Sequence, residues 1–144
     1  MGKEKRGPEM RRLNHLAILV AAVSAFILSS VYYRLFAQQI VDLHPTDPEV
    51  VAAMMKPALW KVLAEVARTV VVAYVLALLV ARQGIRDGKG AAELAVLLWI
   101  GFSLVMWVGA IIWESVPVKL AAIHSGDWLL KTVLIALIVG AWRR

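Results

Sequence analysis

The chain has 144 residues, of which 61% are hydrophobic, and it carries a net charge of +6 at pH 7 without a single cysteine. A soluble domain is about 45–50% apolar, so this composition argues against a water-soluble globular protein. The absence of thiols excludes disulfides, thiolate metal sites and cysteine nucleophiles. The positive charges lie beside long apolar segments, which favours a membrane protein over one that binds nucleic acid.

The first apolar segment, about residues 13–36, follows a basic arm at residues 1–12 that we expect to lie in the cytoplasm. This segment is longer than the apolar region of a signal peptide, about 7–15 residues, and no cleavage-site pattern follows it. We therefore predict a retained membrane-spanning helix. Its small-residue face favours close packing against a helix of the same chain or of a second copy. That face consists of Ala17, Ala21, Ala22 and Ala25.

The segment that follows, about residues 37–58, is the one long loop. Within it, Asp47, Pro48 and Glu49 form a typical helix start, with an acidic cap and a proline in the first turn. A short helix over residues 48–56 could lie in the membrane interface. An ordinary connecting loop is the alternative, and the sequence leaves both open.

Three further apolar segments follow, at about residues 59–81, 91–113 and 118–142. Each is long enough to cross about 30 Å of hydrocarbon as a helix. The last two are separated only by residues 114–117, which is short enough to force an antiparallel hairpin, and Pro117 suits the start of the following helix. The sequence thus predicts an all-α protein with a single domain over residues 13–142, built as a bundle of four membrane-spanning helices.

Lysine and arginine residues indicate how this bundle is oriented. Five lie in the N-terminal arm, three in the loop over residues 82–90 and two at the C-terminus, and all three segments share one side in a four-span topology. The opposite side carries few cations in its loops, together with Asp42, Asp47, Glu49 and Glu114. The positive-inside rule therefore predicts a multi-pass protein of the plasma (inner) membrane with both termini in the cytoplasm.

Charged side chains interrupt the second and fourth spans, where each costs about 2.5–3.5 kcal/mol to insert at a helix centre. Helical spacing places Glu65 and Arg68 on one face of the second span, and Asp127 and Lys131 on one face of the fourth. Because Arg68 and Asp127 are expected at the same depth, we predict that they pair. The predicted cluster, in the outer half of the bundle, comprises Glu65, Arg68, His124, Asp127, Lys131, Tyr32, Tyr33 and Glu114.

The tryptophans follow two patterns. Those at span ends are typical of an aromatic belt at the membrane surface, whereas Trp99, Trp107 and Trp128 lie deeper and are expected to be packing residues. On the third span, a stripe of residues faces one direction. It comprises Trp99, Ser103, Trp107, Ala110 and Glu114.

Two functions fit the polar cluster. The charges of Glu65, Arg68, Asp127 and Lys131 cancel, so the cluster can be a structural network in a non-enzymatic subunit that assembles with itself or with other membrane proteins. Alternatively, it can line the path of a small transporter or proton-coupled carrier. We expect no enzyme, because no nucleophile and base can be paired, and no metal or cofactor, because the three histidines are scattered in depth. The expected surroundings are the lipid bilayer and other subunits, without nucleic acid.

Several local strings carry a resemblance to a known family. They are Tyr32-Tyr33 with Leu35-Phe36, the run 73–79, the turn 113–120, the patch 123–127 and Gly140-Ala141-Trp142. With this layout the chain resembles a group of small bacterial four-helix membrane proteins known as domain-of-unknown-function family 1761. The resemblance implies the four-helix membrane fold and no established activity. Members typically carry Trp, Tyr and His at the places that Tyr32, Asp127 and Trp128 occupy here.

Overall fold

The computed structural model describes residues 13–43, 49 and 56–142 of the chain. Within these ranges the secondary structure is entirely helical, and four of the helical segments are long and apolar enough to cross a membrane. The all-α, four-span fold is therefore confirmed. The elements are α1 (His15–Leu35), α2 (Ala37–Leu43), α4 (Leu59–Arg82), α5 (Gly88–Leu98), the π-helical turn η1 (Trp99–Leu104), α6 (Val105–Trp113) and α7 (Val118–Ala141).

Two elements differ from the sequence prediction. The chain continues after α1 into the short helix α2, which was not predicted, and the third span is built from α5, η1 and α6 in succession. The helix predicted over residues 48–56 lies outside the described residues, apart from its members Glu49 and Lys56. No bounds can be compared for it.

Short polar residues cap two of the spans. The side chain of Asn14 accepts a hydrogen bond from the backbone N–H of Ala17 at the start of α1. Asp87 accepts one from the N–H of Gly90 at the start of α5. These carboxyl and amide oxygens satisfy N–H groups that have no partner within the helix. Gly84 allows the tight turn between α4 and α5, because its φ of +70° is a conformation that side chains disfavour.

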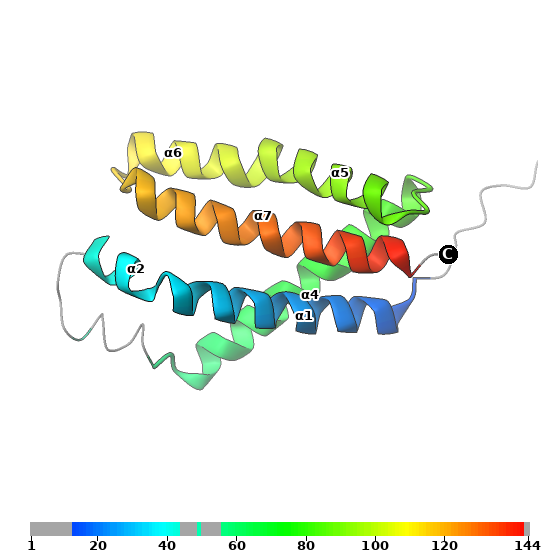
Figure 1. Ribbon diagram of the computed structural model, residues 1–144, viewed down its shortest axis with the longest axis horizontal. Coiled ribbons are helices and arrows are strands. Elements are labelled where there is room, and N and C mark those ends of the chain that lie inside the picture. Colours follow the sequence, from blue (N-terminus) through cyan, green and yellow to red (C-terminus); the bar gives the residue numbers. More distant parts are fainter. Residues whose placement is uncertain (1–12, 44–48, 50–55, 143–144) are drawn as a thin grey trace, which may run out of the picture.

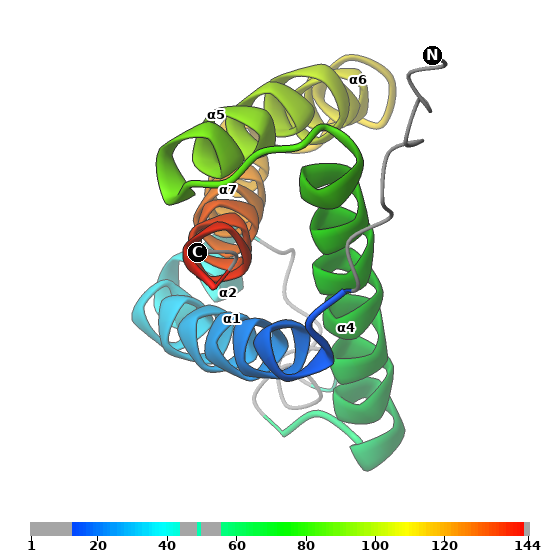
Figure 2. The ribbon, with the colours of Figure 1, turned by 90° about the vertical axis from the view of Figure 1, so that its right-hand side faces the viewer.

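The four spans are arranged around α7. Figure 1 shows α1, α7 and the third span running along the long axis of the molecule, while α4 crosses behind them at a steep angle. In the end-on view of Figure 2, α7 lies between α1 and α5, and α4 closes the remaining side. α7 contacts each of the other three spans, whereas α4 and α5 touch each other little. The beginning of α1 and the end of α7 lie at the same end of the bundle (Figure 1).

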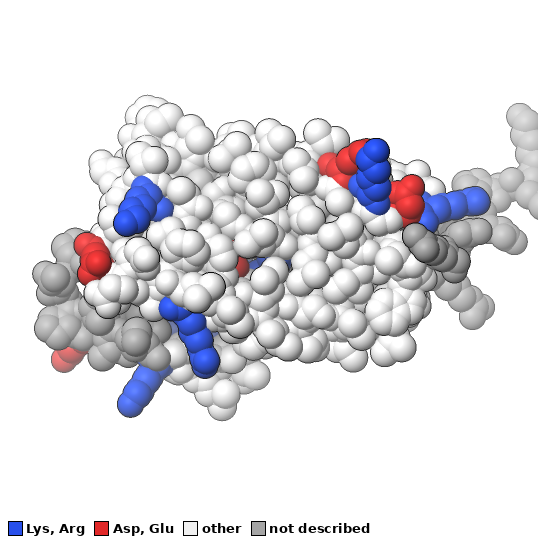
Figure 3. Space-filling model, viewed as in Figure 1, with Lys and Arg blue, Asp and Glu red and all other residues white. Residues whose placement is uncertain are grey.

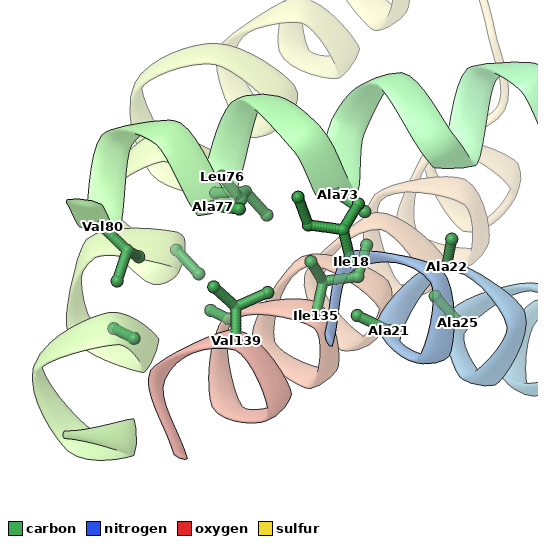
Figure 4. Packing of buried hydrophobic residues seen from close by; sticks show 13 residues of the cluster. Ile18, Ala21, Ala22, Ala25, Ala73, Leu76, Ala77, Val80, Ile135 and Val139 are labelled. Carbon is green, nitrogen blue, oxygen red and sulfur yellow. The ribbon is translucent and has the colours of Figure 1, made fainter. Parts of the chain in front are cut away.

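Small residues make these close contacts possible. Ala17, Ala21, Ala22 and Ala25 are all buried within the chain, so the small-residue face of the first helix is used for intramolecular packing. The central part of the core joins this face to α4 and α7 (Figure 4). There Ile135 and Val80 are fully buried. Where alanines form the contact, the helix backbones can approach closely, as is common in membrane bundles.

Charge is distributed as expected for a membrane protein. On the face shown in Figure 3, most Lys, Arg, Asp and Glu atoms gather toward the two ends of the molecule, and the broad belt between them shows only a small patch of charged atoms near its centre. The spans of 21 to 26 residues have lengths sufficient to cross the hydrocarbon core. Large apolar side chains are exposed along this belt, where lipid would cover them.

Candidate functional site

Two oppositely charged side chains are buried near the middle of α7. Asp127 and Lys131 are exposed by only 2% and 1% of their surface, and they lie one helical turn apart. The Nζ atom of Lys131 is 3.6 Å from Oδ2 of Asp127, which is within ion-pair distance. Burial of an unpaired charge would cost several kcal/mol, so each of these groups requires the other or a further partner.

The partners come from both neighbouring helices. Ser29 of α1 donates a hydrogen bond of 2.6 Å from its hydroxyl to Oδ1 of Asp127. From α4, Glu65 binds the ammonium of Lys131 through Oε1 at 2.8 Å. The second oxygen of Glu65 accepts from Arg68 at the same distance. An ion-pair network thus joins α1, α7 and α4, in the order Ser29, Asp127, Lys131, Glu65 and Arg68.

The predicted pair of Arg68 with Asp127 is wrong. Arg68 binds Glu65 on its own helix, and Lys131 stands between the two carboxylates that belong to different helices. The prediction assumed that the helices run nearly parallel, so that residues at the same depth in the membrane lie opposite each other. The steep crossing of α4 breaks that relation, since residues of α4 and α7 at equal depth do not lie opposite each other (Figures 1 and 2).

Trp128 contributes to the network through its ring. The guanidinium of Arg68 lies 5.1 Å from the centre of a Trp128 ring, and the ammonium of Lys131 lies 5.3 Å from it. A cation over an indole ring is stabilised electrostatically, particularly away from water. The sequence alone predicts only a packing role for Trp128. Its position between Asp127 and Lys131 in the same helix was the signal that could have revealed this role.

The aromatic members of the predicted cluster form a second group beside the network. Tyr33 and Nδ1 of His124 are joined by a hydrogen bond of 2.8 Å. The ring of Trp107 stacks on His124 with centres 5.0 Å apart and planes inclined by 10°. Tyr32 packs edge-on against Tyr33. These contacts connect α1, α7 and α6 in the half of the bundle where α1 ends and α7 begins.

The π-helical turn η1 places two tryptophans against α7. In a regular α-helix, Trp99 and Trp107 would differ by about 80° in direction, because eight residues exceed two turns at 3.6 residues per turn. A single π turn takes up one extra residue and brings them to within about 20° of each other. Trp99 accordingly donates a hydrogen bond of 2.8 Å to the carbonyl of Ser125, and Trp107 reaches His124. Nothing in the hydrophobic pattern indicated this turn.

The structure therefore divides the predicted cluster into three parts. Glu65, Arg68, Asp127 and Lys131 form the ion-pair network. His124, Tyr33 and Tyr32 belong to the aromatic group. Glu114 is exposed at the end of α6 and belongs to neither. Ser29, Trp107 and Trp128 complete the site.

A cavity of about 400 Å³ lies between α1 and α4, beside the ion-pair network. Its walls include Ser29 and Tyr33 from α1, and Lys61, Glu65 and Arg68 from α4. Its size falls within the range of small-molecule sites, about 300–1,000 Å³. A second cavity, of about 420 Å³, lies between α4, η1 and α7, and its walls are almost entirely apolar.

Residues 16–140 match the family described as "Protein of unknown function (DUF1761)". The chain belongs to this family. The DUF1761 match runs from the beginning of α1 to the end of α7, so it includes the ion-pair network, the aromatic group and both cavities.

No curated protein and no solved structure matched the chain in the same comparisons. The description of DUF1761 states no activity, so the geometry of the site is the guide to function. That geometry has two properties: a set of charges that are paired across three helices, and a cavity with part of that set in its wall.

Proposed function

We propose that the chain is a non-enzymatic integral membrane protein of the plasma (inner) membrane that acts as a subunit of a larger assembly. Both termini lie on the cytoplasmic side, as the distribution of Lys and Arg predicts. The assembly contains further copies of this chain or other membrane proteins. The proposal rests on one observation, the sparse cover of the third span.

The third span is far less buried than the others. Within its most apolar window only 6% of the residues are buried, compared with 22–39% in the other three spans. Its main contacts are with α7, so most of its circumference faces outward. Exposed residues include Leu97, Phe102 and Met106. A helix held on one side only is well suited to receive a neighbouring subunit.

The ion-pair network supports a structural rather than a catalytic role. Each charged group in it is bound to an oppositely charged one, and the network ends on the hydroxyl of Ser29. Such an arrangement fixes the relative positions of α1, α4 and α7, because a displaced helix would leave a buried charge without its partner. A subunit with a rigid bundle presents a constant surface to its neighbours.

Cross-linking tests this proposal cleanly, because the chain has no cysteine of its own. Leu97→Cys and Phe102→Cys place single thiols on the exposed face of the third span, and Leu19→Cys places a matched control on the exposed face of α1. We expect oxidation in native membranes to give adducts of defined mass from the third span and few from α1. A chain that remains monomeric at all three positions would contradict the proposal.

A second function, a small transporter or proton-coupled carrier, is favoured by the cavity between α1 and α4. Glu65 lines this cavity and binds the buried Lys131, so the ion-pair network is in contact with the cavity through Glu65. The test is flux in reconstituted vesicles. A carrier requires Asp127→Asn and Glu65→Gln to abolish transport, whereas a structural network requires these variants to lower stability and leave flux unchanged.

A further inference from the structure

The cavity between α1 and α4 has an unusual supply of hydrogen-bond donors. Its hydroxyl groups are already engaged: Ser29 donates to Asp127, Ser30 to the carbonyl of Phe26, and Tyr33 is bonded to His124. A ligand in the cavity cannot use these groups without breaking an existing contact. The donors that remain belong to the cationic side chains of α4.

Those side chains are Lys61 and Arg68, which line the same cavity from positions two turns apart. Arg68 uses one nitrogen to bind Glu65, but a guanidinium has five N–H donors, and 56% of this side chain is exposed. Lys61 is exposed and lies over the ring of Trp60. Among the described residues, no carboxylate lies within ion-pair distance of Lys61.

The balance of charge around the cavity is positive. Among the described residues that line it, Lys61 and Arg68 are cationic and only Glu65 is anionic, which leaves an excess of one positive charge. Glu65 is shared between two cations, so it cannot also neutralise Lys61. An anionic group that contacted both Lys61 and Arg68 would restore the balance.

The remaining walls of the cavity are apolar. Most of the surface that is not charged comes from Phe26 on α1, Val62 on α4 and Pro57, which precedes α4. The cavity exists because α4 crosses α1 steeply, and it is partly open to the surroundings of the two spans. A ligand that fits must therefore combine an anionic end with an apolar body, and the bilayer around these helices contains such molecules.

We propose that the cavity between α1 and α4 binds an anionic phospholipid of the bilayer. Its phosphate contacts Lys61 and Arg68, and the adjoining part of an acyl chain lies against Phe26 and Val62. Binding does not depend on subunit assembly, which uses the third span, and Arg68 can keep its contact with Glu65 because a guanidinium has further donors. A lipid in this cavity would occupy the space that the carrier alternative requires. The bound lipid fills the space between α1 and α4 and so stabilises their crossing angle.

The test compares lipid retention in nanodiscs that contain equal parts of phosphatidylglycerol and phosphatidylcholine, with bound lipid counted by native mass spectrometry after release. The unaltered chain retains phosphatidylglycerol in preference to phosphatidylcholine. Lys61→Gln lowers this retention about fivefold, the loss expected for one lysine contact with an anionic lipid. Ser30→Phe fills the cavity without changing any charge and lowers retention as well.

Lys119→Gln is the matched control, because Lys119 is exposed in the first turn of α7 and does not line the cavity. It leaves retention unchanged. Equal retention by Lys61→Gln and the unaltered chain would overturn the proposal, as would loss of phosphatidylglycerol in the Lys119→Gln control. Displacement of the lipid by inorganic phosphate alone would also overturn it, because the site would then recognise a free anion.

Discussion

Lys131 holds the buried charges together, because its ammonium is the only group placed between carboxylates of two different helices in the part of the chain that the structure describes. Among the described residues it also has the largest of the fully buried side chains. Its long apolar stem fills the space between α7 and α4, and its charged end satisfies Glu65 and Asp127. One residue thus serves both packing and electrostatics.

We expect Lys131→Met to destabilise the folded protein by about 3–5 kcal/mol, since Asp127 would remain charged, buried and without its cation. The double variant Lys131→Met with Asp127→Leu is expected to recover much of this loss, because no unpaired charge is left and Glu65 keeps Arg68. Unfolding by sodium dodecyl sulphate in mixed micelles measures the difference.

A matched control for this experiment is Lys89→Met. Lys89 is paired with Glu93 at 3.8 Å, but both side chains are exposed, and an exposed pair contributes about 0–1 kcal/mol. The role assigned to Lys131 would be contradicted if the two single variants lost similar stability, or if the double variant were less stable than Lys131→Met alone.

Helical spacing predicted which residues gather at this site but could not assign their partners. The charged residues of α4 and α7 meet as their positions indicated, since polar groups must face inward when lipid surrounds the bundle. The choice between Asp127 and Glu65 as the partner of Arg68 depends on the crossing angle of α4. A crossing angle arises from side-chain packing, which a single sequence does not encode in any periodic pattern.

At the level of whole elements, the third span depends on its π turn. In a regular helix, the spacing of Trp99 and Trp107 would point them in different directions. Because η1 takes up one extra residue, both tryptophans face α7. The hydrophobic pattern of this segment gave no sign of the turn. Residues on nearly every side of this helix are apolar, so a shift of one residue does not change the pattern. This part of the fold could not be predicted.

Deletion of Ile100 tests the role of the π turn. Ile100 lies in η1 and is exposed, so its removal should restore a regular α-helix with Trp99 and Trp107 on one face. We expect the variant to fold, to keep its tryptophan near-ultraviolet circular dichroism and to lose less than about 1 kcal/mol. Deletion of Ile27, also exposed but in the regular helix α1, should rotate Ser29 away from Asp127 and prevent accumulation of the folded protein.

A second element contact, between α7 and the beginning of α5, depends on Gly140. A methyl group there would lie 2.7 Å from the backbone oxygen of Asp87 and 2.8 Å from the Cβ atom of Ala91. The helices would have to separate, so Gly140→Ala should cost about 1–3 kcal/mol. Gly109→Ala is the control, because its methyl group would meet no atom within 4 Å. Thermal unfolding in detergent would refute the prediction if both variants melted together.

The arrangement of the whole molecule places the loop between α4 and α5 at one end and the turn between α6 and α7 at the other (Figure 1). Hydrophobic run length predicted the number of spans well, because the membrane dictates the length of a helix that crosses it. It predicted the short helix α2 poorly. Seven residues carry too little periodicity to distinguish a helix from a loop.

The direction of insertion is open to a direct labelling experiment. Gln83→Cys and Glu114→Cys introduce thiols at exposed positions on opposite ends of the bundle. If both termini are cytoplasmic, a membrane-impermeant maleimide should label Glu114→Cys in intact cells and Gln83→Cys only after permeabilisation. The reverse result would invert the topology, and labelling of both positions in intact cells would indicate two orientations.

The central position of α7 has a consequence for how the bundle is made. α7 follows the other three spans along the chain, yet it supplies the principal neighbour of the third span and the partners of Ser29 and Glu65. During synthesis, the earlier helices therefore enter the membrane before their polar groups can be matched. Completion of the bundle is postponed to the final helix, so a nascent chain interrupted before Val118 would keep only the Arg68–Glu65 pair of the network, and Ser29 would lack its acceptor on α7.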